Sequence, residues 1–172
     1  LFYSGSYDSD QWNGYSDSGV LNIGYGSSDP TGIIAIYPPF KGNLFVVKSK
    51  SIYRLEGAYT EDINIIQLSN DLGGVSHAAS ASIDLDDVAF MSYKGIHSIA
   101  ATSNYGAFSS NFLSENIQNT FSDWTASRLK FASATYIQTI NTVFFSVASG
   151  EFDDDKQDSL WLFNTKFKTW SR

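Results

Sequence analysis

The chain carries an internal repeat, and this repeat constrains the fold more than any other feature of the sequence. Residues 44–55 align without a gap on residues 88–99, an offset of 44 residues. In both copies an apolar run meets a short polar turn at the same point, and a second β-rich run follows. Residues 143–147 and 160–164, on either side of a polar loop, form a looser third copy. A period of about 40–45 residues built of short strands is typical of β-propeller blades.

The repeat predicts an all-β, propeller-like chain of about three four-stranded blades with one short inserted helix. We expect an N-terminal strand and Gly/Ser-rich loop over residues 1–31, blade 1 over 32–70 and blade 2 over 75–113. The helix is expected over residues 114–128, and blade 3 with the start of a fourth over 129–172. Propellers typically have at least about four blades, so we expect the chain to form part of a larger propeller.

Local patterns place two further features. The Pro38-Pro39 pair is predicted to end the first strand of blade 1, because proline cannot donate to a β-ladder. Between blades 2 and 3, Ser114 can cap a helix. Three apolar residues then recur at helical spacing: Ile117, Phe121 and Trp124.

The composition narrows the functional classes. The chain is 42% hydrophobic and 16% aromatic, which is enough for a core and too apolar for a disordered chain. It has no cysteine, which excludes disulfides and thiolate metal sites. The net charge is −7 and the 11 Lys and Arg residues are scattered, which argues against a groove that grips nucleic acid. No apolar stretch is long enough to span a bilayer, so we expect no membrane span.

Few residues indicate catalysis. His77 and His97 are the only histidines, and His97 takes a strand position equivalent to that of Tyr53, which favours a structural role. The sequence contains no Gly-x-Ser-x-Gly elbow, no Walker loop and no metal-ligating histidine pair. We therefore expect no enzyme activity, no catalytic residue and no cofactor.

An acidic run near the C-terminus is the strongest local charge feature. It consists of Glu151, Asp153, Asp154, Asp155 and Asp158. Carboxylates can bind a divalent cation, but the spacing is not that of a calcium loop, and a solvated loop tip is the favoured interpretation. We predict no metal site here, and a loop suited to line a channel or contact a neighbouring subunit.

The aromatic residues divide into two groups. Trp124, Trp161 and Trp170 fall on helix or strand patterns, which predicts core packing. The aromatic residues of the polar N-terminal segment are instead predicted to lie on a contact surface: Trp12, Tyr15 and Tyr25.

Several stretches resemble the β-propeller tail proteins of short-tailed bacteriophages. The two main ones are residues 1–12 (Leu-Phe-Tyr-Ser-Gly, then Asp-Ser-Asp-Gln-Trp) and 42–57 (Gly-Asn-Leu-Phe-Val-Val-Lys, then Ser-Ile-Tyr-Arg-Leu-Glu-Gly). Residues 90–96, 113–117 and 160–171 fit the same pattern. The family includes the tail nozzle, or tail tubular, proteins and the packaged-DNA stabilisation proteins, and this chain is much shorter than a complete nozzle subunit.

The resemblance implies a structural virion protein located in the phage tail and assembled in the host cytoplasm. It implies a homo-oligomeric ring that contacts other tail or portal-adaptor proteins. DNA would pass through this ring without sequence-specific binding, and acidic inner loops would let it pass without sticking.

Three other classes of propeller stay open at this point. A carbohydrate- or receptor-binding propeller of the adhesin type would show aromatic residues clustered with Asp or Asn on one concave face. A glycosidase would need two carboxylates facing each other across a central pit. An interaction propeller of the Kelch type is weakly indicated by the Gly73-Gly74 pair, but the Tyr and Trp spacing that accompanies it is absent, as is a Trp-Asp repeat ending.

Overall fold

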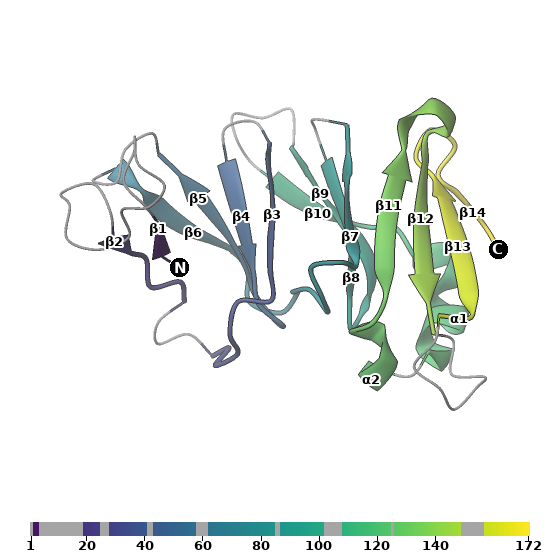
Figure 1. The fold of residues 1–172 in the computed structure, drawn as a ribbon, viewed down its shortest axis with the longest axis horizontal. Coiled ribbons are helices and arrows are strands. Elements are labelled where there is room, and N and C mark those ends of the chain that lie inside the picture. Colours follow the sequence, from purple (N-terminus) through teal and green to yellow (C-terminus); the bar gives the residue numbers. More distant parts are fainter. Residues whose placement is uncertain are drawn as a thin grey trace.

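Three four-stranded antiparallel sheets and one two-stranded sheet make up the structure, which is a computed structural model (Figure 1). It describes residues 2–3, 19–24, 28–40, 43–57, 62–84, 87–101, 108–124, 126–148 and 157–172. In each large sheet every strand pairs with the strand that precedes or follows it in the chain. The prediction of a mostly β chain built from four-stranded units is thus confirmed, and its place in a closed propeller stays a prediction.

The strands lie close to the predicted runs. The first sheet contains β3 (Ala35–Phe40), β4 (Asn43–Val47), β5 (Ile52–Glu56) and β6 (Asn64–Ser69). The second contains β7 (Ser80–Ile83), β8 (Asp87–Ser92), β9 (Gly95–Ala101) and β10 (Phe108–Phe112). The third contains β11 (Ser133–Ile137), β12 (Thr142–Val147), β13 (Ser159–Asn164) and β14 (Thr169–Ser171). The small sheet pairs β1 (Phe2–Tyr3) with β2 (Gly19–Val20).

The strand register shows that the repeat in the sequence is a repeat in space. Equivalent cross-strand pairs join the second and third strands of the three sheets: Val47–Ile52, Met91–Ile96 and Ser146–Leu160. The first two pairs differ by the 44-residue offset of the sequence alignment. The third pair shows that residues 143–147 and 160–164 form the same hairpin with a longer connection.

We call the face of a sheet that points toward the next sheet along the chain its leading face, and the opposite face its trailing face. In the third sheet the leading face is the one that carries the positions equivalent to Ile52 and Ile96. The first and second sheets bury one apolar cluster between them, which includes Phe45, Val47, Phe90 and Ile99. A second cluster, which includes Met91, Ile96, Phe145, Trp161 and Phe163, lies between the second and third sheets. On the trailing face of the first sheet, residues 19–24 supply a cover for a third cluster: Val46, Tyr53, Leu55 with Leu21 and Ile23.

The first strands of the sheets lie next to one another. Strand β7 contacts both β3 and β11, and the backbone N–H of Ala134 donates to the carbonyl of Ala78 at 2.7 Å. Seen in Figure 1, the three sheets form an open row, with the third sheet at one end.

The segment between the second and third sheets is helical, but it is broken into short pieces. These are η2 (Glu115–Ile117), α1 (Gln118–Asp123) and α2 (Ala126–Leu129). Phe121 and Trp124 are buried and Ile117 packs against them, as the spacing predicted. Ser114 takes the N-cap position, but the expected side-chain cap is wrong: the Ser114 hydroxyl makes no capping bond and instead accepts the backbone N–H of Ile96 at 2.9 Å. Its carbonyl accepts the N–H of Ile117 at 3.0 Å, so Ser114 joins the second sheet to the helical segment.

The Pro38-Pro39 pair does not end its strand as predicted. Both residues lie inside β3, where the register shifts between Tyr37 and Phe40. Proline is tolerated in a terminal strand and at an irregularity of the ladder, and β3 provides both.

A buried carboxylate fixes the chain segment that leads into the first sheet. Asp29 is only 2% exposed and accepts hydrogen bonds from the N–H and hydroxyl of Thr31, the N–H of Lys50 and the hydroxyl of Ser51. Burial raises the pKa of Asp29, but these hydrogen bonds outweigh burial and lower the pKa to about 2. The ionised carboxylate therefore ties residues 29–31 to the turn between β4 and β5.

Asp29→Asn should make the free energy of unfolding less dependent on pH in the acid range. A carboxyl whose pKa is lower in the folded state stabilises the fold above its unfolded pKa, and this contribution disappears as the pH falls toward the folded value. The difference in unfolding free energy between wild type and Asp29→Asn should therefore shrink as the pH falls from about 5 to about 2. Urea denaturation at a series of pH values measures it, with Asp123→Asn as the control for loss of an exposed carboxylate. A difference that stays constant over this range would contradict the role assigned to Asp29.

Candidate functional site

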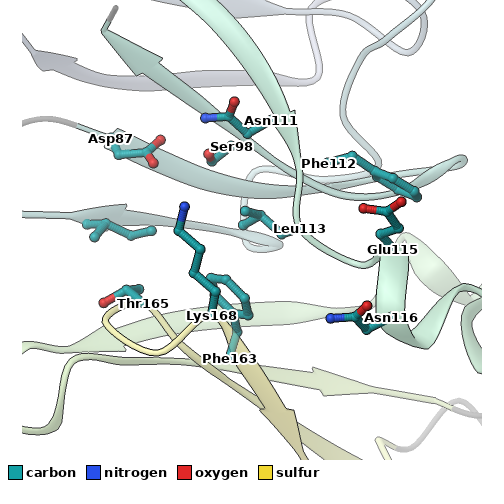
Figure 2. Close-up of a pocket in the computed structure, with 11 residues that line it drawn as sticks. Asp87, Ser98, Asn111, Phe112, Leu113, Glu115, Asn116, Phe163, Thr165 and Lys168 are labelled. Carbon is teal, nitrogen blue, oxygen red and sulfur yellow. The ribbon is translucent and has the colours of Figure 1, made fainter.

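A cavity of about 750 Å³ lies between the second and third sheets (Figure 2). Its lining combines polar and apolar side chains from several separate chain segments. The polar ones are Asp87, Ser98, Asn111, Glu115, Asn116, Thr165 and Lys168. The apolar ones are Ile83, Phe112, Leu113 and Phe163. We refer to this space below as the inter-sheet cavity.

The cavity wall on the second sheet departs from the repeat. Ser98 occupies the position that Arg54 holds in the first sheet, since Ser98 pairs with Ala89 as Arg54 pairs with Phe45. Arg54 is long and bonds Glu56 at 3.0 Å, whereas serine is short and leaves space in front of the sheet. Asn111, directly across from Ser98 on β10, stands beside this space.

The opposite wall is the hairpin between β13 and β14. The Asn164 side chain accepts the backbone N–H groups of Lys166 and Phe167 at 3.1 and 2.9 Å, which closes the turn. The N–H and hydroxyl of Thr165 donate to the carbonyl of Asn141 at 2.8 and 3.0 Å. Lys168 has a positive φ of 53°, a conformation uncommon outside glycine. Figure 2 shows its ammonium group extending into the cavity between the two walls.

Trp170 joins the two walls. Its indole N–H donates to the carbonyl of Leu113 at 2.8 Å, and its ring packs on Phe163 at 4.9 Å and on Phe145 at 6.0 Å. One side chain thus connects the outermost strand of the third sheet to the segment after β10. Trp170, like Trp161 and Trp124, packs in the core cluster as predicted.

The position of Phe112 depends on Gly95 and His97. The Phe112 ring packs against the His97 ring at 5.0 Å, and a Cβ on Gly95 would lie 2.4 Å from the Phe112 ring. His97 is 9% exposed, and burial, with a smaller contribution from the charge of Lys94, lowers its pKa to about 4. His97 is therefore neutral at pH 7 and packs beside Phe112 on the face of the second sheet opposite to Ser98 and Asn111, which agrees with a structural role.

The chemistry of the cavity is that of a hydrogen-bonding site. Two carboxylates, Asp87 and Glu115, accept hydrogen bonds, Lys168 donates them, and the amides and hydroxyls do both. The Ser98 hydroxyl is buried and has no hydrogen-bond partner among the described residues. Within this part of the chain, no three His, Asp or Glu side chains are grouped to hold a metal ion.

The contact residues predicted from the sequence lie elsewhere. Trp12, Tyr15, Tyr25, Glu151, Asp153, Asp154 and Asp155 fall outside the described residues. Asp158 is described: it is exposed, its backbone N–H donates to the carbonyl of Val147 at 3.1 Å, and it does not line the inter-sheet cavity. The cavity residues were not predicted as a site, although the change from Arg54 to Ser98 at one aligned position was a detectable signal.

Comparisons with known proteins give no family assignment. The chain matches no protein-family model, and no curated protein has a matching sequence. None of the helices described above is both long and apolar enough to cross a membrane.

Gly95→Ala should destabilise the second sheet and move Phe112. Gly95 has a φ of +147°, and an added Cβ would also lie 2.6 Å from the Ser114 hydroxyl. We expect a loss of more than about 1 kcal/mol in the free energy of unfolding, measured by urea denaturation. Gly32→Ala is the matched control, because its Cβ would meet nothing within 4 Å, and it should change the stability by less than about 0.5 kcal/mol. Equal stability of both variants would show that the space around Gly95 is not restrictive.

Proposed function

We propose that the chain is a structural subunit that assembles through the leading face of its third sheet into a propeller-type ring. The carrying observation is Leu160. The equivalent residues Ile52 and Ile96 are 2% and 0% exposed beneath the sheet that follows them, whereas Leu160 is 46% exposed. The repeat thus supplies an apolar residue at a position where the first two sheets each meet a neighbour.

Other residues extend this apolar surface. Phe144 and Leu162 are cross-strand partners on the same face, and Ile137 beside them is 41% exposed. None of these residues belongs to the three core clusters formed by the described part of the chain. Thr135 and Ser146 add polar positions, so the face mixes apolar and polar groups as interfaces between separate subunits do.

In this proposal the partner is a second copy of the chain, and the copies build a homo-oligomeric ring. The resemblance to tail nozzle and packaged-DNA stabilisation proteins supports a place in a phage tail, next to other tail or portal-adaptor proteins. The net charge of −7 favours a conduit through which DNA passes without being bound. The acidic run at 151–158 and the aromatic residues Trp12, Tyr15 and Tyr25 remain candidates for channel or subunit contacts. We assign no catalytic step to the chain.

A second candidate function is carbohydrate or receptor binding. The inter-sheet cavity favours it, because the Phe163 side chain lines the same concave space as Asp87, Asn111 and Asn116. This combination of aromatic and Asp or Asn side chains is the sign expected of an adhesin-type propeller.

Leu160→Lys should weaken self-association. A lysine buried in an apolar interface without a partner charge strongly disfavours the complex, so we expect association at least about tenfold weaker. Analytical ultracentrifugation over a concentration series measures it. Phe167→Lys is the control, because Phe167 is 70% exposed in the β13–β14 turn and lies outside the leading face; it should assemble as the wild type does.

Two results would contradict the proposal. If the wild-type chain has the mass of a single copy at every concentration, the leading face of the third sheet is not sufficient for assembly. A Leu160→Lys variant that assembles like the wild type would exclude the face itself. For the assembled species, a ring seen by electron microscopy, on its own or on the axis of a virion, is the expected image.

A further inference from the structure

We propose that the inter-sheet cavity binds a short neutral oligosaccharide. This inference deepens the second candidate function, and it is independent of assembly through the leading face of the third sheet. It assigns a site, a ligand class and the groups that would contact the ligand.

The size and shape of the cavity fit a small-molecule ligand. Its volume of about 750 Å³ falls in the range of about 300–1,000 Å³ that is usual for such sites. Residues from both sheets and from η2 surround it, and Figure 2 shows the Lys168 side chain extending into the space between them. The walls are held by Trp170 and by the closed β13–β14 turn, so the site exists before a ligand enters.

The polar groups match the hydroxyls of a sugar. Each sugar hydroxyl both donates and accepts a hydrogen bond. The carboxylates of Asp87 and Glu115 only accept, the ammonium of Lys168 only donates, and the amides of Asn111 and Asn116 do both. Planar amide and carboxylate groups can bond two adjacent hydroxyls at once. The Phe163 side chain, on the face of the third sheet that borders the cavity, offers an apolar surface for the C–H face of a sugar ring.

Ser98 supplies an independent indication of a ligand. Its side chain is 1% exposed and lies on the cavity wall, and its hydroxyl has no hydrogen-bond partner among the described residues. A buried polar group without a partner is costly, so such groups are usually found where something else pairs with them. A ligand hydroxyl beside Asn111 would restore this pairing, directly or through the reoriented Asn111 amide.

The charge of the lining argues against an anionic ligand. Two carboxylates face one ammonium group in the cavity, and phosphate or sulfate groups would meet net repulsion. Binding of a nucleotide would call for several Arg or Lys side chains or a helix N-terminus, and Lys168 is the only cationic side chain among the described residues that line the cavity. A neutral, hydroxyl-rich ligand satisfies the donors and acceptors without this cost.

The experiment measures binding of three neutral trisaccharides: maltotriose, cellotriose and triacetylchitotriose. Isothermal titration calorimetry on the full chain gives the dissociation constants, and inorganic phosphate serves as the anionic comparison. The test variants are Asn111→Ala and Asn116→Ala, whose side chains are exposed, so that folding is retained. Asn64→Ala, an exposed Asn on β6 of the first sheet, is the matched control. Thermal unfolding of every variant checks that the fold is intact.

We expect at least one trisaccharide to bind saturably and phosphate not to bind. Each cavity variant should weaken that binding about three- to tenfold, the loss typical of one or two neutral hydrogen bonds, and Asn64→Ala should leave it unchanged. Binding that neither Asn111→Ala nor Asn116→Ala weakens would overturn the cavity as the site, while the candidate function of carbohydrate binding would stand. Absence of binding by all three sugars would overturn both, and binding of phosphate alone would replace the neutral sugar by an anion.

Discussion

A four-stranded sheet that is apolar on both faces cannot be stable alone in water, and the rest of the structure depends on this constraint. In the second sheet, Phe90 and Val88 lie on the trailing face and Met91 and Ala89 on the leading face, and each is at most 1% exposed. Such a sheet has to be enclosed between two neighbours. The repeat therefore dictates a row of sheets, and the row in turn creates junctions and end faces where function can reside.

Much of the fold could be predicted from the sequence because strand patterns are local. Strand β5 (Ile52–Glu56) and the turn before it follow from an apolar run broken by polar residues, and the 44-residue offset transfers the same hairpin to the second sheet. The two errors share a cause. The consequences of Pro38-Pro39 depend on whether their strand has a free edge, and the partner of Ser114 is a backbone group 18 residues away. Neither fact is contained in the neighbouring residues.

The inter-sheet cavity could not be predicted in the same way. Its lining residues come from β7, β8, β9, β10, η2 and the β13–β14 hairpin, and Trp170 connects the segment after β10 to the third sheet. The sequence instead predicts contact residues in segments rich in one residue type, such as the acidic run. A comparison of aligned repeat positions is more informative, because the change from Arg54 to Ser98 removes a long side chain from a junction that the fold otherwise fills.

The third sheet carries both proposed functions on opposite faces. Leu162 and Phe163 are adjacent in β13, and since successive side chains of a strand point to opposite faces, Leu162 belongs to the leading face and Phe163 to the cavity. A neighbour that covers Leu160 and Leu162 would therefore contact none of the residues that line the cavity from the opposite face of the sheet. Assembly and ligand binding can be separated by substitution, although they share one hairpin. The hydrogen-bonded β13–β14 turn is the element through which one could influence the other.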